Sequence, residues 1–333
     1  MYFLRVIKVI CFFFRFILKQ RKFNDPYLAS FLVPFYELYN KELDSATLKK
    51  IRAYYCFGVP LVCGVYTRIY GRRISEEERG YAVLGGIATP LIDDFTDNKQ
   101  LSKEELKSLL SFGERANPGT LEEAIVNRIL CRLHENASSP EGFVNAFNHV
   151  IEAQIESEKQ LRRNLSREEI LKITLEKGAW SHILFHYLIR EVPSQQAIGV
   201  ICQMGGVLQI TQDIFDIYKD FRDGISTLAT TCADFREFEE FYRGECIKFC
   251  RMARQLPYNK SDLEFFIILF TNIMARGIVA VRMLSRLQDK SGGGVLPYEK
   301  LERKQLICDM DKPASFLKMI WFAYELVRVR VVP

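Results

Sequence analysis

The sequence predicts an all-α protein: one helical-bundle domain preceded by an N-terminal amphipathic helix. Three observations predict this. Apolar residues recur at helical spacing in most segments, capping signals precede those segments, and the alternation typical of β-strands is absent from the sequence. The chain has 333 residues, of which 48% are hydrophobic, so it has ample material for a core. We expect about eight to twelve helices in a domain at 23–333, after a helix at 1–22.

The first 22 residues are apolar but carry regularly placed cations. At about 100° per residue, Arg5, Lys8, Arg15 and Lys19 fall within an arc of roughly 80°. The cations interrupt the segment too often for a membrane-spanning helix, and it lacks the apolar core and cleavage site of a signal peptide. Two interpretations remain open: a basic helix lying in a membrane surface, or a helix packed on its own domain with its cations outward. The rest of the circumference includes Phe3, Ile7, Ile10, Phe13, Phe14 and Ile17.

Capping residues and helix breakers place the next helices in chain order. Asp44 and Ser45 open a helix that runs to about Tyr70. The capping-box spacing occurs three times, at Ser75 with Glu78, Thr120 with Glu123 and Ser166 with Glu169. Pro193 and Ser194 start another helix. The other predicted helices cover about 102–110, 142–163, 166–190, 235–255, 261–287 and 313–329, with a glycine loop at 290–294.

A first acidic cluster ends the helix that Ser75 opens. It consists of Asp93, Asp94 and Asp97, whose spacing of three and four puts them on one helical face. The preceding segment, 81–92, is almost wholly apolar, so the carboxylates follow a buried helix, where uncompensated charge is expensive. A hard cation such as Mg2+ binds carboxylate oxygens and keeps its other positions for water or phosphate. These three residues are therefore predicted metal ligands.

A second acidic cluster, Asp213, Asp216 and Asp220, has the same spacing on one helical face. Each cluster follows a glycine pair at the same offset, 85–86 for the first and 205–206 for the second. Glycine inside a helix costs about 1 kcal/mol relative to alanine, so the pairs indicate close helix approach or room for a ligand. Acidic residues also crowd helix ends without binding anything, but the repetition favours a metal site for this cluster as well.

Two acidic clusters facing each other across an apolar bundle would bind a metal-complexed polyanion. We expect about two or three Mg2+ ions that bridge carboxylates to phosphate oxygens and stabilise a departing diphosphate. The carbocation left behind would need a dry cavity lined by aromatic rings. Core packing is the more common role for any single aromatic residue. The candidate cavity aromatics are Phe57, Tyr66, Trp180, Phe185, Phe215 and Tyr218.

These motifs resemble those of the class I trans-isoprenoid synthases, over about residues 80–224. The first cluster is similar to their D-D-x-x-D motif. Residues 209–220 resemble the Q-x-x-D-D-x-x-D motif of polyprenyl diphosphate synthases and also the D-x-x-x-D helix of squalene and phytoene synthases. The segment 176–179, Glu-Lys-Gly-Ala, is similar to a helix of the elongating enzymes whose lysine contacts diphosphate. Lys177, Lys219 and Arg222 are accordingly candidate ligands for diphosphate oxygens.

The sequence also departs from the elongating enzymes. Gln212 stands where they have the first Asp of the second motif, no double arginine follows Asp97, and no Gly-Lys-Arg-x-Arg-Pro lies upstream. In those enzymes the missing parts hold isopentenyl diphosphate. The second motif is also not the N-D-x-x-S/T-x-x-x-E form of ordinary microbial cyclases. The chain is therefore most similar to the branch near squalene and phytoene synthases, which includes some bacterial cyclases.

The resemblance implies a Mg2+-dependent terpene synthase. It would ionise a linear prenyl diphosphate, cyclise or rearrange the carbocation, and release diphosphate. One alternative is a prenyltransferase that condenses prenyl diphosphates, either head-to-head or by chain elongation. Another is a non-catalytic helical protein that binds membranes through residues 1–22. The mutual repulsion of six aspartates argues against the latter.

Net charge, cysteine content and absent motifs limit the classes of partner and the cellular compartment that we expect for this protein. The formal net charge of +5 is too mild and too dispersed for nucleic-acid binding. Nine cysteines without paired spacing indicate a reduced, cytoplasmic protein. If residues 1–22 bind a membrane rather than their own domain, the contact is peripheral and at the inner membrane surface. No dinucleotide, P-loop or nucleophile-elbow motif occurs in the sequence. The sequence leaves a homodimer open.

Overall fold

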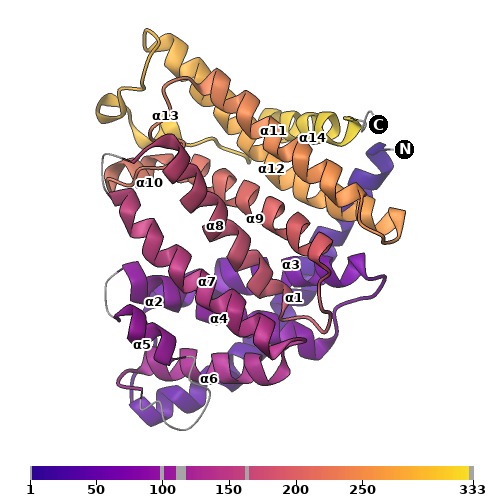
Figure 1. Cartoon of the computed structure of the whole chain (residues 1–333), viewed down its shortest axis with the longest axis vertical. Coiled ribbons are helices and arrows are strands. Elements are labelled where there is room, and N and C mark those ends of the chain that lie inside the picture. The colour runs from indigo at the N-terminus through magenta and orange to yellow at the C-terminus, as the bar shows by residue number, and fades with distance from the viewer. Residues whose placement is uncertain (1, 98–100, 110–117, 162–164, 330–333) are drawn as a thin grey trace. The chain divides into compact units, whose positions relative to one another are not determined.

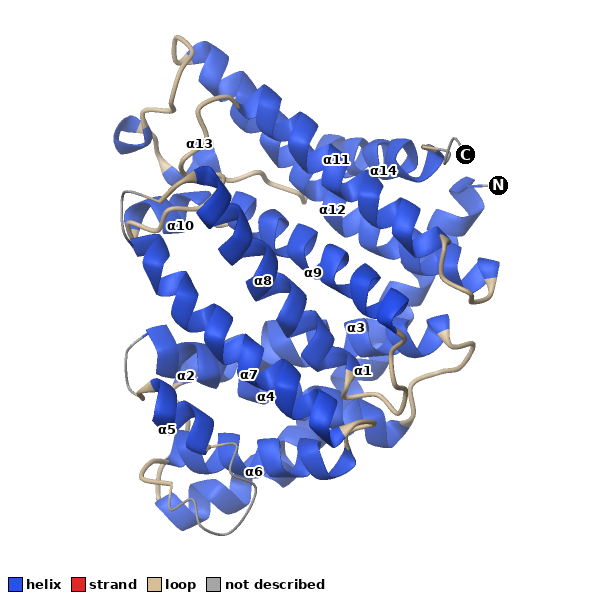
Figure 2. Cartoon of the chain, in the orientation of Figure 1, coloured by secondary structure: helices blue, strands red, loops and turns tan. Residues whose placement is uncertain are grey.

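The computed structural model describes residues 2–97, 101–109, 118–161 and 165–329, and helices make up most of these ranges (Figure 2). No strand occurs in them, which confirms the all-α prediction. Internal contacts divide the chain into two compact units. The N-terminal unit comprises Ile7–Ile155 and Ile183–Pro193, and the C-terminal unit comprises Met1–Val6, Glu156–His182 and Ser194–Pro333. The single domain predicted for 23–333 stays a prediction.

The N-terminal unit is organised around α4, which packs against α3, α6 and a π-helical turn (Figure 1). Its core contains large side chains that are fully buried, such as Tyr66, Leu84 and Phe147. The helices of this unit are most of α1 (Tyr2–Tyr39, from Ile7 onward), α2 (Ser45–Lys50), the π-turn (Ile51–Tyr55), α3 (Cys56–Ile69), α4 (Glu76–Asp97), α5 (Lys103–Ser108), α6 (Leu121–Asn136) and most of α7 (Pro140–Ser157).

Helix α1 is longer than the sequence predicts. It does not stop at residue 22 but continues through Pro26 and Pro34 to Tyr39. Each proline removes one backbone donor and disfavours a helix interior. Burial offsets that loss here, because Leu28 and Leu32 pack into the core beyond the first proline. The N-terminal segment is therefore one end of a long helix that packs on its own protein.

In the C-terminal unit, α12 packs against α9, α11 and α14 (Figure 1). The rings of Phe249, Phe266 and Phe270 pack in tilted and edge-to-face contacts where α11 meets α12. Within the described residues, α12 is also the one helix long and apolar enough to cross a membrane, but 78% of its apolar window is buried. The elements here are a 3-10 turn (Glu158–Leu161), α8 (Arg167–His186, as far as His182), α9 (Gln195–Phe215), α10 (Ile217–Arg222), α11 (Phe235–Arg254), α12 (Lys260–Lys290), a second 3-10 turn (Tyr298–Lys300), α13 (Arg303–Leu306) and α14 (Pro313–Arg328).

Most predicted caps occur as expected. The Ser75–Glu78 and Ser166–Glu169 pairs each form reciprocal capping boxes. The third pair forms half of a box, because the Glu123 carboxylate accepts from the backbone of Gly119. Asp44 caps α2 and Ser194 caps α9. The helix ends predicted at about residues 110 and 163 lie outside the described residues. All nine cysteines are free.

Candidate functional site

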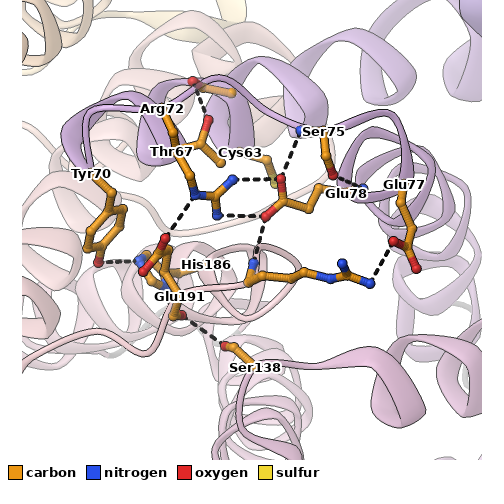
Figure 3. A network of polar contacts seen from close by, with 12 residues as sticks. Cys63, Thr67, Tyr70, Arg72, Ser75, Glu77, Glu78, Ser138, His186 and Glu191 are labelled. Atoms are coloured by element: carbon orange, nitrogen blue, oxygen red, sulfur yellow. Dashed lines mark hydrogen bonds and ion pairs between the residues drawn. The ribbon is translucent and has the colours of Figure 1, made fainter.

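The start of α4, the helix that carries the first acidic cluster, is fixed by a buried ion network in the N-terminal unit (Figure 3). The Glu78 carboxylate is fully buried and accepts two hydrogen bonds from the Arg72 guanidinium, Nη2 to Oε1 at 2.7 Å and Nη1 to Oε2 at 2.8 Å. The backbone N–H groups of Ser75 and Arg190 donate to the same carboxylate at 2.9 and 2.7 Å. Arg72 Nε also donates to Glu191 at 2.8 Å.

These hydrogen bonds determine the charge of Glu78. Burial alone would raise its pKa, but the bonds from Arg72 and from the two backbone N–H groups outweigh burial and lower the pKa to about 2. The carboxylate is therefore ionised at neutral pH. Nearby, His186 accepts from or donates to the Tyr70 hydroxyl at 2.9 Å, and burial lowers its pKa to about 3, which keeps the imidazole neutral.

At the other end of α4, the first acidic cluster is half-buried and already has protein partners. Gln154 on α7 donates from Nε2 to Asp93 Oδ1 at 2.6 Å. Asp94 lies 3.6 Å from the ammonium of Lys50 on α2. The side chain of Asp97, predicted as the third ligand, lies outside the described residues, although its backbone ends α4. Two of the three predicted carboxylates therefore have partners in the protein, Asp93 a hydrogen-bond donor and Asp94 an ion-pair partner.

The glycine pair that precedes this cluster marks close approach, as one of the two sequence interpretations predicts. A Cβ at Gly86 would lie 2.7 Å from the carbonyl oxygen of Tyr55 in the π-turn, and one at Gly85 would lie 2.8 Å from Leu188 Cδ1. Only a residue without a side chain lets α4 lie this close to the π-turn.

The second acidic cluster lies on two helices rather than on the one continuous helix that the sequence predicts. Helix α9 ends at Phe215, Asp216 has φ −88° and ψ 4°, and α10 begins at Ile217. The helical hydrogen-bond spacing between the aspartates continues through the bend. Asp216 N–H donates to Gln212 O and Asp220 N–H donates to Asp216 O, both at 2.9 Å. The residue after the bend, Ile217, is fully buried.

Two neutral side chains hold Asp213. Gln209, one turn earlier on α9, donates from Nε2 to Oδ1 at 2.9 Å, and Thr174 on α8 donates to Oδ2 at 3.4 Å. Lys177 lies one turn beyond Thr174, and its charge opposes the rise in the pKa of Asp213 that burial causes. Of the predicted cations, Lys177 therefore acts on the cluster from the neighbouring helix.

A backbone contact between α8 and α9 sets this arrangement. A Cβ at Gly178 would overlap the carbonyl oxygen of Gly205, and a Cβ at Gly205 would overlap that of Gly178. Gly206 packs equally closely against Leu175. The second glycine pair thus also marks close helix approach, and the contact places the residue next to Lys177 directly against α9.

Burial and mutual repulsion perturb the carboxylates of the second cluster. Burial raises the pKa of Asp213 to about 6. Burial, together with the charges of Asp213 and Asp216, raises the pKa of Asp220 to about 7. The pKa of Asp216 is raised by burial as well, while Lys219 opposes the rise. In the C-terminal unit, three acidic groups therefore share a site that strongly favours added positive charge.

The donor chemistry of both clusters fits Mg2+. Within the described residues, no group of three or more His, Cys, Asp or Glu side chains is arranged to hold a metal ion. Mg2+ does not require such a cage, because it commonly binds through one or two carboxylates and completes its octahedron with water and phosphate oxygens. All ligands available in the two clusters are hard oxygens, which is the set this cation prefers.

The other predicted site residues are dispersed. Lys219 lies on α10 among the second cluster, whereas Arg222 is exposed at the end of α10. Tyr66 is buried against His186 in the N-terminal core. Phe215 lies under the guanidinium of Arg276 at 5.1 Å. Of the remaining aromatics, Phe57 lines a surface pocket of the N-terminal unit, and Trp180, Phe185 and Tyr218 are half-buried.

Sequence reasoning missed the side chains that position the aspartates: Lys50, Gln154, Thr174 and Gln209. A signal existed for Gln209, which is one helical turn before Asp213, and for Thr174, which is one turn before Lys177. No signal in the sequence indicated Gln154, because its hydrogen bond to Asp93 joins residues that are 61 positions apart.

The chain matches no protein-family model, and no curated protein matches it.

Proposed function

We propose that this protein is a Mg2+-dependent isoprenoid synthase that ionises a linear prenyl diphosphate and cyclises or rearranges the resulting carbocation. The observation that carries the proposal is the second cluster, where Asp213 and Asp220 are buried together with their pKa values raised to about 6 and 7. Buried carboxylates that lie close together cost folding free energy unless a cation neutralises them. Carboxylates with strongly shifted pKa values are also concentrated at functional sites.

Each cluster would have a defined part in the reaction. Bound Mg2+ would supply the charge that stabilises the leaving diphosphate. On α4, Asp93 and Asp94 would offer carboxylate oxygens, with Gln154 fixing the rotamer of Asp93. On α9 and α10, Asp213, Asp216 and Asp220 would do the same.

The cations would bind the diphosphate, and apolar side chains would protect the carbocation. Lys177 and Lys219 lie beside the second cluster, where their ammonium groups could donate to diphosphate oxygens. Phe215 and Tyr218 lie among the aspartates of the second cluster in sequence, so their rings are the aromatic candidates that we assign to the site of ionisation. Exclusion of water there would prevent premature quenching of the cation.

A condensing prenyltransferase is the second candidate, favoured by the position of Lys177. Its charge acts on Asp213 from the neighbouring helix, and the elongating enzymes that this segment resembles use a lysine there for diphosphate. The purified protein should be incubated with Mg2+ and linear substrates from geranyl to geranylfarnesyl diphosphate, with and without isopentenyl diphosphate. A terpene hydrocarbon or alcohol from a single substrate supports the synthase. Product only with isopentenyl diphosphate, or only as a dimer of two prenyl units, supports the transferase.

Aspartate substitutions test both clusters in the same assay. We expect Asp93→Asn and Asp216→Asn each to lower diphosphate release by at least about 100-fold, because each removes a metal ligand without changing shape. Asp223→Asn, a matched change at an exposed residue just beyond α10, should leave turnover near the wild-type value. Circular dichroism checks that all three proteins fold. Full turnover in a chelator, or in both of the first two variants, would refute the proposal.

A further inference from the structure

Helix α1 has two apolar faces, and its own unit covers one of them. Val9, Phe16 and Leu28 are buried in the core. Phe14 and Leu18, on another side of the helix, are 63% and 65% exposed. Large apolar side chains such as these two are unusual as neighbours on a helix surface that faces only water. Packing on the protein, one of the two interpretations of this segment, therefore accounts for only some of its apolar residues.

The exposed residues form a continuous stripe. Ile7, Cys11, Phe14 and Leu18 follow one another at steps of four, three and four, and all four are exposed. At about 100° per residue they fall within an arc of roughly 60°. We call these four residues the outer stripe. The next step of three along the same line is Arg21.

Cations border the outer stripe along one side. Lys8, Arg15, Lys19 and Lys22 occupy the adjacent arc, and all four are exposed. Within the described part of the chain none of them forms an ion pair, so their charge is available to an external partner. A helix with an apolar stripe beside a row of cations has the composition of a helix that lies in the headgroup region of a bilayer.

A basic pocket continues the stripe at its C-terminal end. Arg21 lines a pocket of about 430 Å3 in the N-terminal unit, together with Lys49 and Arg52. Asp25 is the single carboxylate in the lining, so the pocket carries an excess of positive charge. Among the described residues, none of its three cations has an ion-pair partner. The pocket suits the phosphate of an anionic headgroup.

We propose that the outer stripe and this pocket dock the protein on an anionic lipid bilayer. Phe14 and Leu18 lie in the acyl boundary, the bordering cations lie among lipid phosphates, and one headgroup phosphate binds between Arg21 and Arg52. This surface is independent of the aspartate clusters, so the inference stands whether or not the proposed reaction is correct. A second copy of the chain fits poorly, because stripe-to-stripe pairing would bring the two rows of cations together.

Vesicle binding with point variants tests the docking surface. Removal of residues 1–22 is unsuitable, since it also deletes Val9 and Phe16 from the core. The full-length protein is sedimented at low salt with phosphatidylcholine vesicles that contain about one third phosphatidylserine. We expect Phe14→Ser/Leu18→Ser to lower the partition coefficient at least about tenfold.

A matched control exists on the same helix. Val33 and Leu38 are 44% and 77% exposed but lie outside the outer stripe. Val33→Ser/Leu38→Ser should therefore bind vesicles as the wild type does. Arg21→Glu/Arg52→Glu should abolish the preference for anionic over pure phosphatidylcholine vesicles. Thermal melts of all variants exclude loss of folding as the cause.

Three outcomes would overturn the inference. The wild-type protein could fail to sediment with anionic vesicles. The stripe variant could bind as tightly as the wild type, which would place the contact elsewhere. Finally, light scattering could show a dimer that Phe14→Ser/Leu18→Ser converts to a monomer, which would make the outer stripe a surface between copies.

Discussion

The two acidic clusters differ in how completely the protein itself satisfies them. Asp93 and Asp94 are half-buried, and each has a donor in Gln154 or Lys50. Asp213 and Asp220 are buried, and burial raises their pKa values to about 6 and 7, helped at Asp220 by the charges of Asp213 and Asp216. The charges of the first cluster are compensated by neighbouring side chains, whereas the buried charges of the second cluster destabilise the fold and would be compensated by a bound cation.

The supports of the two clusters differ in the same way. A buried ion network around Glu78 fixes the helix that carries the first cluster (Figure 3). A backbone contact between Gly178 and Gly205 fixes the helices around the second. The helix of the first cluster is therefore fixed by an ion network in addition to its close approach to the π-turn, whereas steric fit between α8 and α9 supports the second cluster. Four substitutions test this contrast, from the largest expected effect on stability to the smallest.

Glu78→Gln should cause the largest loss of folding stability among the four substitutions. The change leaves the Arg72 guanidinium without its bidentate carboxylate and weakens two backbone hydrogen bonds, so we expect unfolding to become easier by about 3 kcal/mol. Because the pKa of Glu78 is lowered to about 2 in the folded state, its stabilisation is present above the unfolded value, near 4.5, and is lost as the pH falls toward 2. Urea titrations at pH 7 and pH 3 measure both effects, and equal losses at the two pH values would contradict the assignment.

Gly205→Ala should destabilise the second support by about 2 kcal/mol. The new methyl group would overlap the carbonyl oxygen of Gly178, and backbone cannot move aside as a side chain can. Gly199→Ala on the same helix is the control, since its nearest neighbour is the flexible end of Met252 at 3.7 Å. The control should be neutral or slightly stabilising, because alanine is the better helix former. Differential scanning calorimetry compares the two, and a stable Gly205→Ala protein would show that the contact is not required.

Asp220→Asn, unlike the two preceding substitutions, should stabilise the protein. We expect the free energy of unfolding to rise by on the order of 1–2 kcal/mol at pH 8 in the presence of a chelator. The pKa of Asp220 is raised to about 7, so the folded state binds a proton that the unfolded state, near 3.9, does not. Its charge therefore destabilises the fold progressively as the pH rises from about 4 to 7 and fully above 7. The gain should shrink at pH 5, and Asp94→Asn should show no comparable gain at either pH.

Lys50→Ala should change stability by less than about 0.5 kcal/mol. The ammonium lies 3.6 Å from Asp94, and both side chains are partly exposed, so solvent screens the pair. A loss above about 1 kcal/mol in urea titrations would show that the first cluster depends on this cation more than its exposure indicates.

Local signals in the sequence predicted much of the fold. Capping boxes at Ser75 and Ser166 and the cap at Ser194 form as expected, because they depend on residues only three positions apart. The glycine pairs correctly predicted close helix approach. The course of α1 through Pro26 was not predictable, since burial on the rest of the protein outweighs the local preference of proline.

The sequence predicts the aspartates of the candidate site as metal ligands, which stays a prediction, but it does not predict the side chains that support them. Spacing identified the aspartates, yet the bend at Asp216 replaces the single helix that the pattern predicts. The partners Gln154 and Thr174 come from other helices, and only the folded chain brings them to Asp93 and Asp213. The network around Glu78 is similarly built from residues distant in sequence, among them Arg190, whose backbone donates to the buried carboxylate.

The contact between Gly178 and Gly205 also bears on how freely this protein can vary. Each backbone occupies the space that a side chain on the other would need, so a replacement at one position cannot be compensated by a change at the other. In a saturation library selected for folded protein, both positions should therefore accept glycine alone. Gly58 and Gly244, where an added Cβ meets nothing within 4 Å, should accept many residues in the same library. Such a library would identify this crossing of α8 and α9 without reference to activity.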